Sequence, residues 1–175
     1  MAKYIIPIKL PRLIVFDLDD TLWKYEVDCT YGPPFKYDRK NKVVVDCRGN
    51  SVELFREVLE IFALIQTFPD TQIAIASRTT TPDWATQVLK LYTVGELGSL
   101  YSMCTALEMY DQSKTKHFRR IHQRTHIDYK DMLFFDDNPM NLCVEPLGVS
   151  VAMLDYDGMT MSVFLQSLQL FAQNR

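Results

Sequence analysis

Short apolar runs that stop at polar residues are the clearest pattern in the chain. Leu13–Phe16, residues 73–76 and residues 132–135 each consist of four apolar residues, and polar groups follow each run. Short apolar runs bounded in this way are typical of strands that are buried on both faces of a sheet. Two further strands are predicted at 100–104 and 149–154.

Segments with helical periodicity alternate with these runs. They cover residues 57–66, a stretch from Pro82 to Tyr92, 113–126, 139–145 and 161–171. Thr81 and Pro82 suit the cap and the first position of their helix. The alternation predicts an α/β fold with a doubly wound, Rossmann-like, mostly parallel sheet and helices on both faces. The polar strand ends then lie along one edge of that sheet.

Residues 24–50 interrupt the alternation and are rich in turn-forming residues. We predict a small β-hairpin flap after the first strand, with 42–47 as one strand and 23–27 as its partner. A long insertion beside an acidic cluster more often covers a site than serves as a passive connection, and no large cap domain is expected. The basic residues of the flap include Lys36, Arg39, Lys40, Lys42 and Arg48. A substrate-gripping patch and an ordinary solvated hairpin face explain them equally well.

The composition is that of a globular protein and restricts the partners. The 175 residues suit a single domain, 1–175, with the flap as an insertion. The net charge of −3 gives no general attraction to nucleic acid. No apolar run suits a signal segment or a membrane span, so we expect no membrane partner and a cytoplasmic or nuclear location. Four widely spaced cysteines are expected to be reduced thiols.

Polar residues at three strand ends and one lysine form a candidate site. They are Asp17, Asp19, Ser77, Arg78, Asp136, Asp137 and Lys114. Residues 17 and 19 of an extended chain point the same way, with Cα atoms roughly 7 Å apart, so both carboxylates can face one ligand. Together with Asp137 they would form an all-oxygen pocket that suits Mg²⁺. A hydroxyl and Lys114 facing that metal indicate an anionic ligand, of which phosphate is the natural candidate.

These residues also resemble a known family. Asp17-Leu-Asp19-Asp-Thr21 after an apolar strand resembles motif I of the haloacid-dehalogenase (HAD) superfamily. Ser77, Lys114 and the Asp136-Asp137 pair resemble motifs II, III and IV in order and spacing. Over nearly the whole chain, further matches resemble the magnesium-dependent phosphatase-1 family; they include Pro-Pro-Phe at 33–35, Ala-Ser-Arg-Thr at 76–79 and Asp-Gly-Met at 157–159. Members of this family commonly have tyrosine where this chain has Asp20, and glutamate where it has Asn138.

The resemblance implies Mg²⁺-dependent phosphomonoester hydrolysis through an aspartyl phosphate. Asp17 would be the nucleophile and Asp19 the acid and base, while Thr21 would orient the loop. The metal would be held by Asp17, by the backbone carbonyl of Asp19 and by Asp137, with Asp136 either behind these ligands or joined to the metal through water. The substrate-binding residues would be Asp17, Leu18, Asp19, Ser77, Arg78 and Lys114. The implied substrate is phosphotyrosine in a protein, or a sugar phosphate.

Other classes of protein share parts of this pattern. A signalling receiver domain also combines an acidic pair, an acceptor aspartate, a hydroxyl and a lysine on a doubly wound sheet. Its acceptor lies on a middle strand, whereas here the middle strand ends in Ser77 and Arg78. A catalytically silent interaction domain would keep the fold, but no motif residue is missing. His122 and His126 could share a helix face, yet no third zinc ligand accompanies them.

Overall fold

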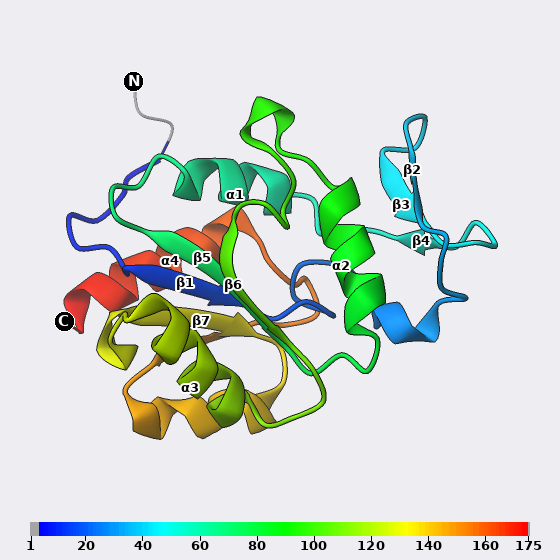
Figure 1. Cartoon of the computed structure of the whole chain (residues 1–175). Helices are drawn as coiled ribbons and strands as arrows, with labels where there is room; N and C mark the ends of the chain where they lie inside the picture. Colours follow the sequence, from blue (N-terminus) through cyan, green and yellow to red (C-terminus); the bar gives the residue numbers. More distant parts are fainter. Residues whose placement is uncertain (1–3, 175) are drawn as a thin grey trace.

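The computed structural model describes residues 4–174 and contains one five-stranded sheet. Its strands are β1 (Leu13–Phe16), β5 (Gln72–Ser77), β6 (Cys104–Met109), β7 (Met132–Asp136) and β8 (Ser150–Met153). All neighbours are parallel, in the order β6-β5-β1-β7-β8. Figure 1 shows the carboxyl ends of these strands on one edge, as predicted.

The strand order separates this fold from that of a receiver domain. Numbered along the chain, the five strands run 3-2-1-4-5, which is the Rossmann-like order, whereas flavodoxin-like receivers have 2-1-3-4-5. Our expectation that the middle strand ends in Ser77 is wrong, because β1 itself lies in the middle of the sheet. The order reverses between β1 and β7, and ligands of such folds bind outside this switch point.

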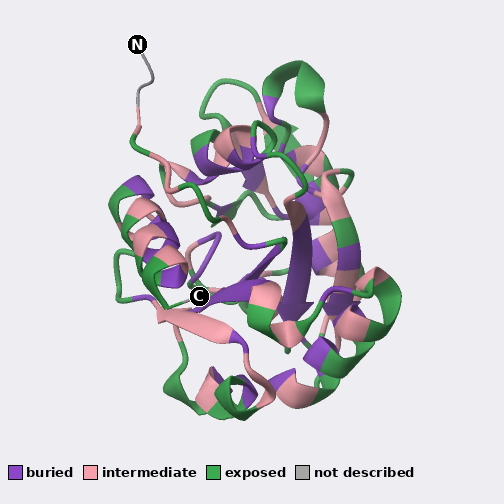
Figure 2. Ribbon diagram, turned by 90° about the vertical axis from the view of Figure 1, so that its left-hand side faces the viewer, coloured by how far each residue is buried: buried purple, intermediate pink, exposed green. Residues whose placement is uncertain are grey.

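Helices cover both faces of the sheet (Figures 1 and 2). Ile14 and Phe16 pack towards α1 (Val58–Ile65), α2 (Pro82–Leu91) and α4 (Met161–Gln173). Leu13 and Val15 pack on the other face, towards α3 (Lys114–Thr125) and the 3₁₀ segment η4 (Pro139–Leu147). Successive residues of a strand point to opposite faces. The four apolar residues of β1 therefore contribute to two cores, one on each face of the sheet.

The strand predicted at 100–104 is misplaced. Residues 100–103 form turns, and β6 begins only at Cys104. The Leu100 amide donates to the Tyr92 carbonyl, and the Tyr101 amide donates to the Leu89 carbonyl. Since these amides are committed to the end of α2, they cannot join the sheet. Two more 3₁₀ turns lie in the connections between helices and strands. The turn η2 (Gly95–Leu97) precedes β6, and η3 (Tyr129–Asp131) precedes β7.

The flap is a three-stranded antiparallel sheet beside the main one (Figure 1). Its strands β2 (Lys36–Asp38), β3 (Val43–Val45) and β4 (Ser51–Val52) follow the 3₁₀ turn η1 (Val27–Cys29). The predicted pairing of 23–27 with 42–47 is wrong, because β3 pairs with β2 and β4. Trp23 instead lies fully buried in the main core and forms isolated bridges to Asp19 and Leu54.

A buried tyrosine fastens the flap to α2. The Tyr92 hydroxyl donates to the Val52 carbonyl at 2.5 Å and accepts from the Val44 amide at 3.0 Å.

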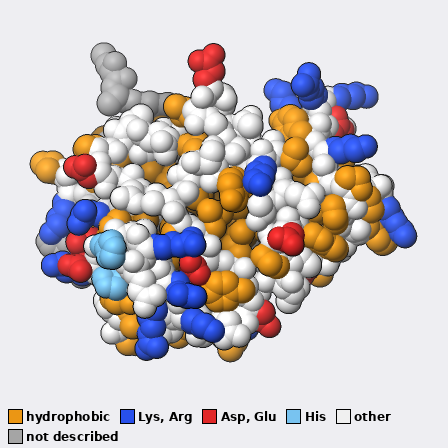
Figure 3. All heavy atoms as spheres, in the orientation of Figure 1, with side chains coloured by type: hydrophobic (Ala, Val, Ile, Leu, Met, Phe, Trp, Pro, Cys, Tyr) orange, Lys and Arg blue, Asp and Glu red, His pale blue; other side chains and the backbone are white. Residues whose placement is uncertain are grey.

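Figure 3 shows Lys and Arg side chains gathered over the tip of the flap and over α3. In the described part of the chain, no helix is long and apolar enough to cross a membrane.

Candidate active site

The predicted site residues meet at the carboxyl ends of β1, β5 and β7, around a pocket of about 300 Å³. The pocket is lined by Asp17, Asp19, Asp20, Glu26, Asp28, Ser77, Arg78, Thr79, Thr80, Asp111, Lys114, Asp137, Asn138 and Asn141. Seven of these residues are acidic and only two are basic. A pocket with this excess of carboxylates has a strongly negative potential, which attracts cations.

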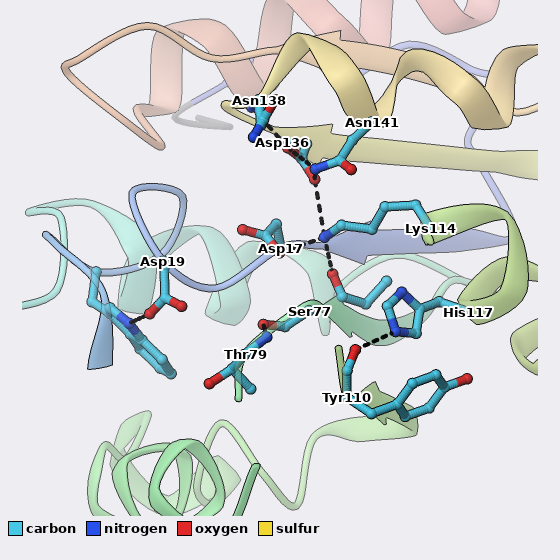
Figure 4. Close-up of polar contacts among 12 residues, drawn as sticks. Asp17, Asp19, Ser77, Thr79, Tyr110, Lys114, His117, Asp136, Asn138 and Asn141 are labelled. Carbon is cyan, nitrogen blue, oxygen red and sulfur yellow. Dashed lines mark hydrogen bonds and ion pairs between the residues drawn. The ribbon is translucent and has the colours of Figure 1, made fainter. Parts of the chain in front are cut away.

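The ammonium group of Lys114 joins three strands at the floor of this pocket (Figure 4). Lys114 opens α3, and its side chain is only 1% exposed. Its Nζ donates to Asp17 Oδ1 and to the Ala76 carbonyl, and it lies 3.0 Å from Asp136 Oδ2. A buried ammonium is stable only when it is paired. Lys114 thus fixes the side chain of Asp17 between β5 and β7.

The Asp136 carboxylate is saturated with hydrogen bonds. Its Oδ1 accepts from the Asn138 amide at 2.8 Å and from Asn141 Nδ2 at 2.9 Å. Its Oδ2 faces Asn141 Nδ2 and Lys114 Nζ, each at 3.0 Å. Asp136 is fully buried, whereas Asp137 is only partly buried and lines the pocket. Asp136 therefore holds Lys114, and Asp137 is the carboxylate that can reach a ligand.

Burial raises the pKa of Asp17 from 3.8 to about 7. The nearby Lys114 lowers this pKa, but the negative charge of Asp136 raises it further. A single ammonium cannot offset the desolvation of two adjacent carboxylates. Additional positive charge in the pocket would favour the ionised form of Asp17.

Asp19 has a different environment, at the base of the flap. Its Oδ1 accepts from Trp23 Nε1 at 2.7 Å and from the Val27 amide at 2.9 Å. Burial raises its pKa from 3.8 to about 6, although these two hydrogen bonds oppose the shift. A carboxyl group with such a pKa can exchange a proton near neutral pH.

Ser77 and Arg78 lie at the end of β5. Ser77 is 1% exposed, and its Oγ accepts from the Thr79 amide at 3.2 Å, which leaves its own proton to donate to a ligand in the pocket. The Arg78 side chain is half exposed and lies 3.6 Å from Asp111 Oδ1. The guanidinium is therefore drawn towards the rim rather than the floor of the pocket.

The donor set fits a hard divalent cation. Carboxylate oxygens of Asp17, Asp136 and Asp137 lie within 4.8 Å of one another. Oxygen-only sites of this kind suit Mg²⁺ better than zinc or copper. Because the hydrogen bonds of Asp136 are already made, Asp17 and Asp137 are the carboxylates available to such an ion.

Comparison with known proteins agrees with this geometry. The family model described as Acid Phosphatase matches residues 9–174. Human magnesium-dependent phosphatase 1 is 37% identical over 166 residues, which cover 94% of this chain and 89% of the human protein. The chain belongs to the magnesium-dependent phosphatase-1 family of the HAD superfamily. A HAD-like hydrolase superfamily protein of Schizosaccharomyces pombe is 35% identical, over 82% of this chain and 85% of its own length.

A solved structure of low sequence identity has the same fold. It is the N-terminal part of a Bacteroides fragilis protein, described as containing a phosphatase domain and complexed with Mg. The two structures superpose with a TM-score of 0.62 at 18% identity, over 94% of this chain and 40% of the other. The likeness supports the HAD-like α/β architecture of this family member.

Two residues that we expected to act at the site of this HAD protein, Leu18 and Thr21, have fully buried side chains. The Leu18 side chain is fully buried, and its carbonyl accepts the amides of Thr21, Leu22 and Trp23. Leu18 could therefore meet a substrate through its backbone amide only. Thr21 is fully buried too, and its Oγ1 makes no hydrogen bond within residues 4–174.

The sequence reasoning missed several residues that support the site of this family member. Asn141 and Trp23 hydrogen-bond to the two carboxylates described above, but an asparagine in a short helix and a tryptophan in a loop carry no signal of their own. Among the described residues, two clusters of side chains could hold a metal ion. Neither cluster includes His122 or His126. His122 instead lies with Nδ1 2.8 Å from the Ile127 carbonyl.

His117 is a buried histidine of α3. It lies one turn after Lys114 in α3, fully buried, with Nε2 3.0 Å from the Tyr110 carbonyl and its ring against the Tyr110 ring (Figure 4). Burial is the main cause that lowers its pKa from 6.5 to about 4; the positive charges of Lys114, Arg78 and Lys116 act in the same direction, and the contact with the Tyr110 carbonyl opposes them. Its Nδ1 has no partner within the described residues, so the neutral ring is the form that fits.

Proposed function

We propose that the protein is a Mg²⁺-dependent phosphomonoester hydrolase that acts through an aspartyl phosphate on Asp17. The observation that carries the proposal is the position of Asp17. It lies at the floor of an acidic pocket, is held by Lys114, and has Asp19 two residues away with a pKa of about 6. The family supports the same activity, since the human relative is named as a magnesium-dependent phosphatase.

The metal would be held by Asp17, Asp137 and the backbone carbonyl of Asp19. Bound there, Mg²⁺ would favour the ionised form of Asp17 and offset negative charge on the phosphoryl group. This contribution is needed because Lys114 alone leaves the pKa of Asp17 near 7.

The reaction would proceed in two displacements. An Asp17 oxygen attacks phosphorus, the bond to the leaving oxygen breaks, and the Asp19 carboxyl gives its proton to that oxygen. A water molecule then attacks the phosphorus of the aspartyl phosphate, Asp19 takes a proton from it, and Asp17 and phosphate are released. Asp19 can do both steps since its pKa of about 6 makes both protonation states accessible near neutral pH.

The transferring phosphoryl oxygens would be held by groups around Asp17. The Ser77 hydroxyl and the Arg78 amide lie at the end of β5, and the Lys114 ammonium lies beside Asp17. The backbone of Leu18 and Asp19 would complete the site. Donors aimed at oxygens on which charge develops are the largest single source of stabilisation in many enzymes.

The substrate is proposed to be phosphotyrosine in a protein or a sugar phosphate. Within residues 4–174 no large cap covers the site, and the flap lies beside it (Figure 1). An open pocket of about 300 Å³ admits the phosphate of a bulky substrate. A panel of phosphotyrosine peptides and sugar phosphates, compared by kcat/KM, separates the two classes. A cytoplasmic or nuclear location and action as a single domain stay predictions.

The activity is tested by release of phosphate from p-nitrophenyl phosphate. We expect activity with Mg²⁺, none in EDTA, and none in Asp17→Asn, which keeps the shape of the side chain but removes the nucleophile. Asp70→Asn is the matched control, because Asp70 is exposed and lies before β5, at the opposite edge of the sheet. Equal release by wild type and Asp17→Asn would refute the nucleophile. No release by the folded wild type would favour a silent interaction domain.

A further inference from the structure

A second hollow of about 500 Å³ opens beside the catalytic pocket, on the side of the flap. Asp20 and Glu26 line both hollows, so the two adjoin. The rings of Tyr25 and Tyr31 contribute to the second hollow and are unusually exposed for aromatic side chains, at 75% and 57%. A hollow walled by aromatic rings next to a reacting centre is suited to part of a substrate.

The orientation of Asp19 indicates which part of the substrate would lie there. Its carboxyl group is bonded to the Val27 amide and to Trp23, at the base of the flap. If Asp19 protonates the leaving oxygen, the leaving group must lie on the flap side of the pocket. Another part of that rim is bridged, because Thr80 Oγ1 donates to Asp28 Oδ2 at 2.6 Å. The second hollow adjoins the pocket on this side.

The backbone around Tyr25 is held in a conformation that exposes the ring. Asp20 and Tyr25 have positive φ angles of 52° and 64°, and the Tyr25 amide donates to Asp20 Oδ1 at 3.0 Å. A bulky residue rarely adopts a positive φ, and such conformations often occur at functional sites. The guanidinium of Arg48 lies 4.1 Å from the centre of the Tyr31 ring and covers one of its faces. Tyr25 is therefore the ring that offers an exposed face.

The charges around the junction are mostly negative. Asp20 and Glu26 lie where the two hollows meet, with Asp28 on the adjoining rim, and Arg48 is the opposing charge beside Tyr31. We propose that the second hollow is a leaving-group subsite for phosphomonoesters with a flat ring and a neutral or cationic tail, and that it disfavours anionic tails. The proposal rests on the phosphatase activity proposed above.

Three aryl phosphates with the same phenolic leaving group test the charge preference. They are phosphotyramine with a cationic tail, its N-acetyl derivative with a neutral tail, and the phosphate ester of 3-(4-hydroxyphenyl)propionate with an anionic tail. At about 10 Å and an effective dielectric constant of about 50, one carboxylate favours a cation or disfavours an anion by about threefold. We expect kcat/KM to fall in the order cationic, neutral, anionic at low ionic strength, with at least about a tenfold difference between the extremes.

Asp20→Asn isolates the charge from the geometry. Asparagine tolerates the positive φ and keeps an oxygen that can accept from the Tyr25 amide. This variant should lower the ratio of kcat/KM between the cationic and anionic esters by about ninefold. Asp70→Asn is again the matched control, because Asp70 is exposed with a φ of 60° and lies at the far edge of the sheet. It should leave the ratio unchanged.

Tyr25→Asn tests the ring. The variant keeps a residue that tolerates the backbone but removes the aromatic face, whereas Tyr25→Phe keeps that face. We expect Tyr25→Asn to raise the KM of the neutral ester by about fivefold. The inhibition constant of inorganic phosphate, which needs only the catalytic pocket, should stay the same. Tyr25→Phe should behave like wild type.

The subsite and the proposed activity can fail separately. Equal kcat/KM for the three esters in wild type, or an unchanged KM in Tyr25→Asn, would overturn the subsite while the phosphatase stands. Absence of any hydrolysis would overturn the activity. Calorimetric binding of the three esters to Asp17→Asn with Mg²⁺ then still judges the subsite, which requires the cationic ester to bind more tightly than the anionic one.

Discussion

The buried ring of His117 should make the stability of the protein fall as the medium becomes acidic. The folded state holds this histidine neutral with a pKa of about 4, whereas the unfolded chain binds a proton near pH 6.5. A group whose pKa is lowered by folding contributes stability above its unfolded pKa and loses it as the pH falls towards the folded pKa. For His117 this window runs from about pH 6.5 to 4.

The magnitude follows from the shift. A difference of 2.5 pKa units corresponds to about 3 kcal/mol in the free energy of unfolding between pH 7 and pH 4. Asp17 and Asp19 have raised pKa values, so their protonation in the same window changes stability in the opposite direction. The prediction therefore concerns the difference between wild type and His117→Gln, whose amide can still donate to the Tyr110 carbonyl but does not titrate.

Urea unfolding followed by circular dichroism, repeated from pH 7 to pH 4, measures this difference. We expect the stability of wild type relative to His117→Gln to decline by about 3 kcal/mol over that range. His126→Asn is the control: His126 is exposed and its φ of 56° suits asparagine, so the variant removes a histidine without changing the core. A difference between wild type and His117→Gln that stays constant with pH would show that the folded state does not hold His117 neutral.

Three further substitutions test other contacts. Asn141→Leu removes the two hydrogen bonds that Nδ2 donates to the buried Asp136 and should lower the free energy of unfolding by about 2 to 3 kcal/mol, as measured in urea. Asp19→Asn should lower kcat by about 10² to 10⁴ for an alkyl phosphate and by less for p-nitrophenyl phosphate, whose leaving group needs no proton; an equal loss for both would contradict the acid role. Tyr92→Phe removes the bonds to Val44 and Val52 and should destabilise the protein by about 1 to 3 kcal/mol, with faster hydrogen exchange in the flap than in the main sheet.

The main sheet was predictable because burial on both faces leaves a direct record in the sequence. Leu13–Phe16 must be apolar at every position, since successive residues serve opposite cores. The end of β1 was equally visible, because carboxylates directly after such a run have no place in a core. Position in the sheet was not visible, since strand order depends on how distant segments pair. Hence β1 was not recognised as the middle strand.

The parts that could not be predicted depend on contacts between residues far apart in the chain. The strand register of the flap is fixed by Tyr92, which lies 40 residues after Val52, so no local pattern reveals it. Lys114 is one of several basic residues in its helix, and its burial follows from Asp17, directly after β1, and from Asp136 on β7. The different roles of Asp136 and Asp137 likewise follow from the hydrogen bond between Asn141 and Asp136. In the sequence, two adjacent aspartates cannot be distinguished.

The three contacts of Lys114 also have a consequence for biosynthesis. Its ammonium group binds atoms of Asp17 directly after β1, of Ala76 on β5 and of Asp136 on β7. A nascent chain that ends before β7 has no acceptor from that strand, and so it lacks one of the two carboxylates that neutralise the buried lysine. Asp17, the proposed nucleophile, is therefore fixed in place only after about four fifths of the chain, as far as Asp136, has left the ribosome, and we expect shorter nascent chains to show no phosphatase activity.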